Sequence, residues 1–253
     1  MILDSFRLTG KNALVTGSSR GMGAAIAIAL AQAGAHVAVH ASKSVPEDVI
    51  LAVAASGVRH VGVTGDLSHP DEAPELIDKT IAALGSIDIL INNAGITRRA
   101  NAVDYSIADW NDVIATNLTS VFRLCQCAAR PMIEQGFGKI VNIASLLSFQ
   151  GGITVPAYAA AKGGVAQLTK ALANEWAPLG VQVNAIAPGY MATELTEALQ
   201  NDPTSSRQIL ERIPAARWGS PEDVAGAAVF LSSSASNYIS GHVLVVDGGW
   251  LGR

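Results

Sequence analysis

A tyrosine and a lysine stand four residues apart in the segment Tyr158-Ala-Ala-Ala-Lys162. On a helix this spacing puts both side chains on one face. A phenol ordinarily titrates near about pH 10, and a neighbouring ammonium favours the phenolate and lowers the phenol pKa. Tyrosine can then serve as a general acid or base. Such a pair alone is more often a packed ring beside a solvated charge, so other residues must support this interpretation.

Two polar residues supply that support. Ser145 closes the fifth predicted strand in Val141-Asn142-Ile143-Ala144-Ser145, where its hydroxyl could hold a substrate carbonyl beside Tyr158. Asn117 lies inside a long helical pattern, where asparagine is unfavourable by propensity. A specific partner is therefore expected for its amide, with a structural bend or a capping role as the alternative.

A glycine-rich turn, Thr16-Gly17-Ser18-Ser19-Arg20-Gly21-Met22-Gly23, follows the first predicted strand and opens the first helix. Glycines let the backbone approach a pyrophosphate, and the helix N-terminus offers free N–H groups and a positive dipole end. The spacing is Gly-x-x-x-Gly-x-Gly rather than the commoner Gly-x-Gly-x-x-Gly. Its place between a strand and a helix predicts nucleotide binding rather than a simple turn.

The second predicted strand ends in Ala41-Ser42-Lys43, with no acidic residue. An NAD site usually has an acidic residue there to bind the ribose 2′-hydroxyl. With Arg20 as a further cation nearby, the arrangement favours a 2′-phosphate and therefore NADP(H), while NAD(H) remains possible. The alternative is that Lys43 and Arg20 are merely solvated.

Short apolar strands alternate with helices along the chain, which predicts one parallel sheet covered on both faces. The expected strands are 12–16, 37–41, 60–64, 87–92, 139–143, 181–186 and 243–246. The expected helices are 24–33, 46–56, 70–84, 108–135, 156–178 and 221–231. The pattern predicts a single doubly wound α/β domain over 1–253. The more polar stretch 190–214 interrupts it and suits a substrate lid, with a surface excursion as the alternative.

Composition excludes several classes of function. The 253 residues are 49% hydrophobic and 15% charged, with a net charge of −4 and no basic block, so nucleic acid is not an expected partner. No apolar run approaches the roughly 20 residues of a membrane span, and no signal peptide is visible. Cys125 and Cys127 should not pair and are expected as packed thiols in a reducing cytoplasm. No metal site is expected.

Taken in order, these motifs resemble the short-chain dehydrogenase/reductase family over nearly the whole chain. The set is Thr16-Gly17-x-x-x-Gly21-x-Gly23, Asp66, Asn92-Asn93-Ala94-Gly95, Asn117, Ser145, Tyr158-x-x-x-Lys162 and Pro188-Gly189. The resemblance implies a Rossmann-type sheet of seven strands in the order 3-2-1-4-5-6-7, commonly within a homotetramer.

The resemblance also implies roles for individual residues. Tyr158 would be the acid/base, Ser145 the carbonyl holder, and Asn117 the holder of a relay water. Lys162 would bind the nicotinamide ribose and tune Tyr158. The residues assigned to the cofactor are Gly17, Ser19, Arg20, Gly21, Met22, Gly23, Ser42, Lys43, Asp66, Leu67, Asn93, Ala94, Gly95, Tyr158, Lys162, Pro188, Gly189, Met191 and Thr193.

A narrower likeness is to the 2-dehydro-3-deoxygluconate 5-dehydrogenases and the gluconate 5-dehydrogenases. It rests on Ile96-Thr97-Arg98-Arg99, Ser148-Phe149-Gln150-Gly151-Gly152, Asn174-Glu175-Trp176, Ala187–Thr193 and Val246–Leu251. These groups act on sugar acids, whose carboxylate a guanidinium matches bidentately. Arg98 or Arg99 could anchor it, or both could lie at a subunit interface. The expected substrate residues are Arg98, Arg99, Ser145, Gln150 and Tyr158.

The sequence thus predicts an NAD(P)-dependent oxidoreductase that transfers a hydride between its cofactor and a hydroxyl or carbonyl of a small sugar acid. Two alternatives remain. A 3-oxoacyl carrier-protein reductase would carry the same motifs but would want a basic surface for its acidic partner. A catalytically silent nucleotide-sensing regulator should have lost part of the set Asn117, Ser145, Tyr158 and Lys162, all of which is present.

Overall fold

A single parallel sheet organises the computed structural model, which describes residues 1–253. Its seven strands run in the order β3-β2-β1-β4-β5-β6-β7, which confirms the order that the family resemblance implies. The strands are β1 (Asn12–Val15), β2 (His36–Ala41), β3 (His60–Thr64), β4 (Ile89–Asn92), β5 (Gly138–Ile143), β6 (Val181–Pro188) and β7 (Val243–Val246). Because all pairings are parallel, the carboxyl ends of β1, β4, β5 and β6 meet along one edge.

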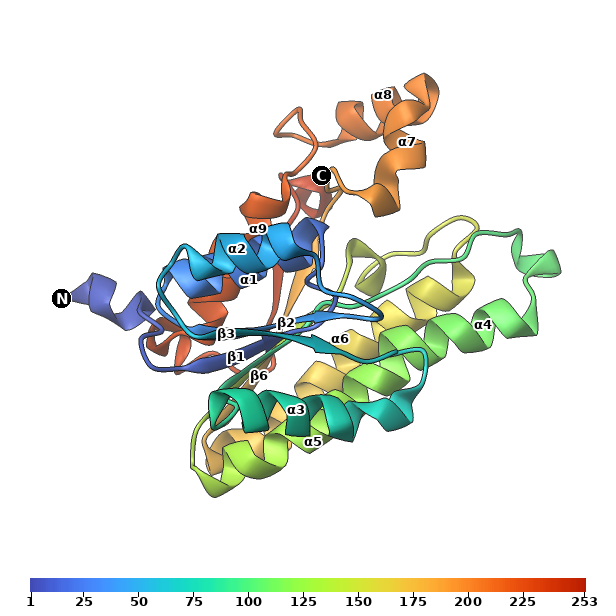
Figure 1. Cartoon of the computed structure of the whole chain (residues 1–253). Helices are drawn as coiled ribbons and strands as arrows, with labels where there is room; N and C mark the ends of the chain where they lie inside the picture. Colours follow the sequence, from blue (N-terminus) through green and yellow to red (C-terminus); the bar gives the residue numbers. More distant parts are fainter.

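Helices cover both faces of this sheet, so the strands can be apolar on both sides. Along β1, Leu14 packs into one core cluster while Ala13 and Val15 pack into the other, as the two-residue period of a strand requires. Figure 1 shows α1 (Gly21–Gln32), α2 (Glu47–Ala54) and α9 (Pro221–Ser232) on one face. The opposite face carries α3 (Ala73–Leu84), α4 (Ile107–Ile114), α5 (Ser120–Glu134) and α6 (Pro156–Trp176). None of the helices is long and apolar enough to cross a membrane.

The single helix predicted over 108–135 is wrong in one respect. The chain forms α4, then one turn of π-helix over Ala115–Thr119, and then α5. On α5, Cys125 is buried and Cys127 is partly buried, and both are free thiols. Burial raises the pKa of the Cys125 thiol to about 12, so this group is inert at neutral pH.

The segment 190–214 is more ordered than its polar composition suggests. It contains α7 (Glu197–Asn201) and α8 (Pro203–Arg212), which stand away from the sheet in Figure 1. The α8 helix starts at a clear signal, because the Asp202 carboxylate accepts hydrogen bonds from the amides of Thr204 and Ser205. Neither α7 nor α8 was predicted from the sequence pattern.

Candidate active site

The glycine turn between β1 and α1 is packed too tightly for side chains. A Cβ added at Gly17 would lie 2.8 Å from the Cα of Ala94, and one at Gly23 would overlap the Gly17 carbonyl oxygen. Gly17 and Gly21 also have φ angles of +60° and +54°, which favour glycine. The turn therefore forms a cradle at the N-terminus of α1, and this arrangement fits the pyrophosphate of a dinucleotide.

The loop after β4 holds that turn in place. The Asn93 amide nitrogen donates hydrogen bonds to the carbonyls of Thr16 and Gly17 at 2.9 and 3.0 Å. The Thr16 hydroxyl accepts from the backbone amides of Asn93 and Ala94 at 3.0 and 3.1 Å. Two segments predicted for the cofactor site, 16–23 and 93–95, are thus one hydrogen-bonded unit.

His40, a strand residue that was not among the predicted site residues, also supports the turn. Its Nδ1 accepts a hydrogen bond from the Gly17 amide at 2.9 Å, and its Nε2 lies 2.9 Å from the Gly65 carbonyl. This pattern requires a neutral ring with the proton on Nε2. Burial lowers the pKa of His40, and the charges of Asp66 and Glu72 act in the opposite direction.

Acidification should therefore destabilise the fold through His40. In the unfolded chain a histidine gains its proton near pH 6.5, whereas the folded His40 has a lower pKa and stays neutral. The contribution of His40 to the unfolding free energy is fully present above pH 6.5. Below that pH it decreases by up to about 1.4 kcal/mol per pH unit. We expect the unfolding free energy of the His40→Asn variant to depend less on pH than that of the wild type. It can be measured by urea unfolding between about pH 7.5 and about pH 5. Parallel profiles would remove His40 from this linkage, since the other histidines are common to both proteins.

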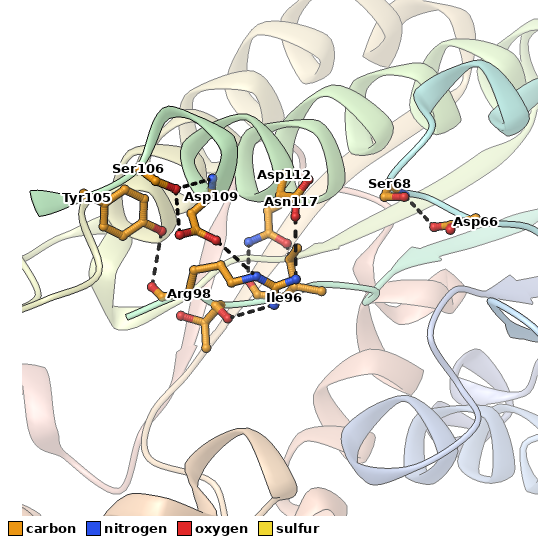
Figure 2. Close-up of polar contacts among 10 residues, drawn as sticks. Asp66, Ser68, Ile96, Arg98, Tyr105, Ser106, Asp109, Asp112 and Asn117 are labelled. Carbon is orange, nitrogen blue, oxygen red and sulfur yellow. Dashed lines mark hydrogen bonds and ion pairs between the residues drawn. The ribbon is translucent and has the colours of Figure 1, made fainter. Parts of the chain in front are cut away.

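The ends of β2 and β3 surround the expected adenosine side of the cofactor. The Asp66 carboxylate accepts a hydrogen bond from the Ser68 amide at 2.9 Å, which lowers the Asp66 pKa (Figure 2). Ser42 and Lys43 are exposed at the end of β2. Arg20 is arranged differently from the expectation, because its Nε lies 3.0 Å from Glu194 at the start of the 190–214 segment. Its charge is paired there, which leaves Ser42 and Lys43 as the free polar groups beside β2.

Ser145, Tyr158 and Lys162 come together where β5 ends and α6 begins. Lys162 is 3% exposed, and its ammonium donates a hydrogen bond to the Ile143 carbonyl at 2.6 Å and lies 5.6 Å from the centroid of the Tyr158 ring. Burial without an acidic partner lowers the pKa of Lys162 to about 8.

The expected lowering of the Tyr158 pKa is wrong for the protein as it stands. Burial raises the pKa of this phenol above its ordinary value of 10.0. The Ser145 hydroxyl and, to a smaller extent, the charge of Arg99 partly counter this effect. Desolvation by burial is the largest of these effects, so the pKa is raised on balance.

Asn117 lies in the π-helical turn and is fully buried. Its Oδ1 accepts a hydrogen bond from the Ile96 amide at 2.8 Å, and its Nδ2 donates to the Ile96 carbonyl at 2.7 Å (Figure 2). The expected specific partner of Asn117 is therefore the backbone of the loop that follows β4. π-Turns inserted into α-helices often occur at functional sites.

A cavity of about 710 Å³ opens beside Tyr158. The predicted site residues that line it are Met22, Arg99, Ser145, Gln150, Tyr158, Pro188, Gly189, Met191 and Thr193. Its wall includes the cations Arg99 and Arg212 and no aspartate or glutamate. Two walls come from opposite parts of the chain, the loop after β4 and the 190–214 segment.

The neighbouring arginines predicted as alternative anchors have different surroundings. Arg98 is turned toward α4, with its guanidinium 3.6 Å from the carboxylates of both Asp109 and Asp112 (Figure 2). Arg99 forms no ion pair and lines the cavity. The structure thus separates two residues that the sequence could not distinguish.

Comparison with known proteins decides the family. A family model described as enoyl-(acyl carrier protein) reductase, one group of short-chain dehydrogenases, matches residues 17–251. The chain belongs to the short-chain dehydrogenase/reductase family. That description names one activity within a family of NAD(P)-dependent oxidoreductases, and the substrate of this short-chain dehydrogenase depends on its own pocket.

Individual relatives of this short-chain dehydrogenase are similar along their full length. It is 52% identical to the 2-dehydro-3-deoxy-D-gluconate 5-dehydrogenase of Escherichia coli K12, with 100% of both chains covered. A structure from Agrobacterium tumefaciens with bound NADP is 51% identical, has a TM-score of 0.92, and matches over 98% of this chain and 99% of its own. A gluconate 5-dehydrogenase from Burkholderia cenocepacia, in complex with NADP and tartrate, is 41% identical with a TM-score of 0.93 and 100% of both chains covered.

Proposed function

We propose that this short-chain dehydrogenase/reductase interconverts a hydroxyl and a carbonyl on a small sugar acid, with 2-keto-3-deoxygluconate or a related uronate-derived keto acid as the substrate. The observation that carries the proposal is the unpaired Arg99 guanidinium in a cavity that also contains Tyr158 and no acidic side chain. A carboxylate that is desolvated in a pocket needs such a partner. The names of the Escherichia coli and Burkholderia relatives support the same substrate class.

The residues around the cavity divide the chemistry among them. When bound, the nicotinamide cofactor accepts or supplies the hydride. Tyr158 Oη accepts the proton of the substrate hydroxyl in oxidation and returns it to the carbonyl oxygen in reduction. The Ser145 hydroxyl would donate a hydrogen bond to that oxygen, and the Lys162 ammonium would bind the cofactor ribose and favour the phenolate. Asn117 would hold a water of the proton relay.

An alanine pair tests the substrate assignment. Arg99→Ala should lower kcat/KM for a sugar acid by about 10–150-fold relative to an uncharged analogue, because it removes a hydrogen bond to a charged group. Arg98→Ala is the matched control, since Arg98 pairs with Asp109 and Asp112 instead. The measured quantity is the ratio of kcat/KM for the charged and the uncharged substrate. An Arg99→Ala enzyme with an unchanged ratio would contradict the carboxylate anchor.

We further propose NADP(H) as the preferred cofactor. Ser42 and Lys43 are free at the end of β2, and no carboxylate ends this strand. The Agrobacterium and Burkholderia structures contain NADP, which supports the preference.

A single substitution at the end of β2 tests this preference. Ala41→Asp puts a negative charge where the 2′-phosphate is expected, and like charges about 4 Å apart repel by about 1 kcal/mol even in water. NADP(H) use, measured as kcat/KM, should fall about fivefold or more while NAD(H) use is kept. Ala41→Asn controls for the change of shape. Equal losses with both cofactors, or in both variants, would show a packing defect instead.

The acyl-carrier alternative fits the cavity less well. An acyl tail would leave the guanidiniums of Arg99 and Arg212 facing apolar groups without a counter-charge, which is costly. A silent regulator is disfavoured by the assembled set of Ser145, Tyr158 and Lys162.

Three features of organisation belong to the same proposal. Residues 1–253 act as one dinucleotide-binding and catalytic domain, with 190–214 as a substrate lid, and the Arg20–Glu194 pair between turn and lid supports this arrangement. The chain forms a homotetramer, which the exposed apolar side chains of Val103, Ile107 and Trp110 near α4 support. The enzyme works in the cytoplasm, in keeping with its free thiols.

A further inference from the structure

The last residue of α8 brings a second guanidinium into the substrate cavity. Arg212 lines the cavity and forms no ion pair in the structure. Arg207 on the same helix differs, because it lies 3.8 Å from Glu211 one turn later. Arg212 is therefore a cation without a protein counter-charge, and it belongs to the lid segment rather than to the loop that carries Arg99.

Aromatic stacking holds Arg212 in place. Its guanidinium lies 4.1 Å from the centroid of the Trp250 ring, and Trp250 is itself buried. The indole nitrogen donates to the Gln150 side-chain oxygen at 3.4 Å, which ties this ring to the opposite wall of the cavity. A guanidinium stacked by its face keeps its N–H groups at the edge available for a ligand.

Hydrogen bonding and apolar packing also hold the backbone around Arg212. Arg253 donates a hydrogen bond to the Glu211 carbonyl at 2.8 Å, and Ile209 and Ile213 pack with Trp250 in a small core cluster. The end of α8 is thus anchored to the C-terminal residues. This support orients Arg212 before any ligand arrives, which lowers the entropic cost of binding.

Charge counting shows what such a cavity should bind. Arg99 and Arg212 supply two positive charges from different walls, and no aspartate or glutamate lines the cavity. A ligand with one carboxylate can neutralise only one of them. A ligand with a carboxylate at each end offers a counter-charge for each of them.

We propose that Arg212 forms a second anion-binding position in the substrate cavity and that the enzyme therefore binds dicarboxylic hydroxy acids as well as monocarboxylic ones. The inference rests on the proposed function in one respect, namely that Arg99 binds the first carboxylate. Arg212, on the lid segment, binds the second carboxylate at the far end of the ligand.

Two four-carbon acids test the proposal as competitive inhibitors against the sugar-acid substrate. Tartrate has a carboxylate at both ends, and threonate of matching configuration has a hydroxymethyl group in place of one. Arg212→Ala should raise the inhibition constant of tartrate by about 10–150-fold, the range of one hydrogen bond to a charged group, and change that of threonate by less than about threefold. Arg212→Lys should restore part of the tartrate affinity, because it keeps the charge without the planar fork.

Matched variants separate the possible failures. Arg207→Ala, on the same helix, should leave both constants unchanged. Arg99→Ala should weaken both inhibitors, and if it weakens neither, the proposed function fails irrespective of Arg212. Equal weakening of both inhibitors by Arg212→Ala would mean that this residue only supports the lid, and no effect on tartrate would mean that it binds no anion; either result overturns the proposal. The rise in melting temperature on adding tartrate gives the same comparison without turnover.

Discussion

Replacing Tyr158 with phenylalanine should lower turnover by about 10²–10⁴-fold, the usual contribution of general acid–base catalysis. The ring stays in place, but the proton that must move between Oη and the substrate oxygen is gone. Steady-state kcat at saturating cofactor and substrate measures the loss. The dissociation constant of NADP(H), from fluorescence titration, should change little, because the glycine turn and the loop after β4 are untouched. Near-normal turnover in this variant would exclude Tyr158 as the acid/base.

Replacing Lys162 with methionine should have the next largest effect. An ammonium within about 4–6 Å lowers the pKa of an acidic group by about 1–3 units. Burial raises the pKa of Tyr158, and Ser145 and the charge of Arg99 partly counter this rise. The Lys162 ammonium lies 5.6 Å from the centroid of the Tyr158 ring, and we expect it to favour the phenolate further. Oxidation needs the phenolate, so its rate rises with pH. In Lys162→Met this rise should occur at a pH about 1–3 units higher than in the wild type. At a fixed pH below the rise, the variant should oxidise its substrate about 10–10³-fold more slowly than the wild type.

The pH dependence distinguishes tuning from cofactor binding. The pKa of Lys162 is about 8, so its ammonium loses its proton above that pH. The difference in oxidation rate between the wild type and Lys162→Met should therefore decrease above about pH 8. Lys170→Met is the control, because Lys170 lies on the same helix but is exposed. If the limb stays in place and only the KM for the cofactor rises, Lys162 binds the ribose without tuning the phenol.

Strand positions were predictable because the signal is strong. A parallel sheet covered on both faces needs runs of apolar residues, and such runs bounded by turns mark all seven strands to within a few residues. The strand order came from the resemblance, and the observed pairings confirm it.

Helices were less predictable where the backbone departs from the α pattern. The π-turn at Ala115–Thr119 keeps the chain helical and contains no glycine or proline, so no helix-breaking residue marks it. The α8 helix was predictable in principle, because Asp202 followed by Pro203 is a helix-start signal. The polar composition of 190–214 concealed it.

The residue types of the site could be predicted from the sequence, but the directions in which their side chains point could not. Arg98 and Arg99 are identical side chains on adjacent residues, and only the path of the loop turns one toward α4 and the other into the cavity. His40 could not be recognised, because a histidine in a strand gives no sign that its ring bonds to Gly17 and Gly65. The Tyr158 pKa depends on burial in three dimensions, which the i to i+4 spacing does not report.

The π-turn at Ala115–Thr119 also determines what a single-residue deletion in this part of the chain would do. A π-turn holds one residue more than the α-turn it replaces, and Asn117 depends on that extra residue to reach Ile96. A π-turn advances by about the same angle as an α-turn with one residue fewer. Deleting one residue within Ala115–Thr119 would therefore join α4 and α5 into one regular helix whose faces stay nearly in place. Leu124 and Cys125 would stay in the core, whereas Asn117 would lose its two bonds to Ile96. Such a deletion would thus damage the site while leaving the packing of the helix nearly intact. Homologous sequences should therefore align across this stretch without gaps.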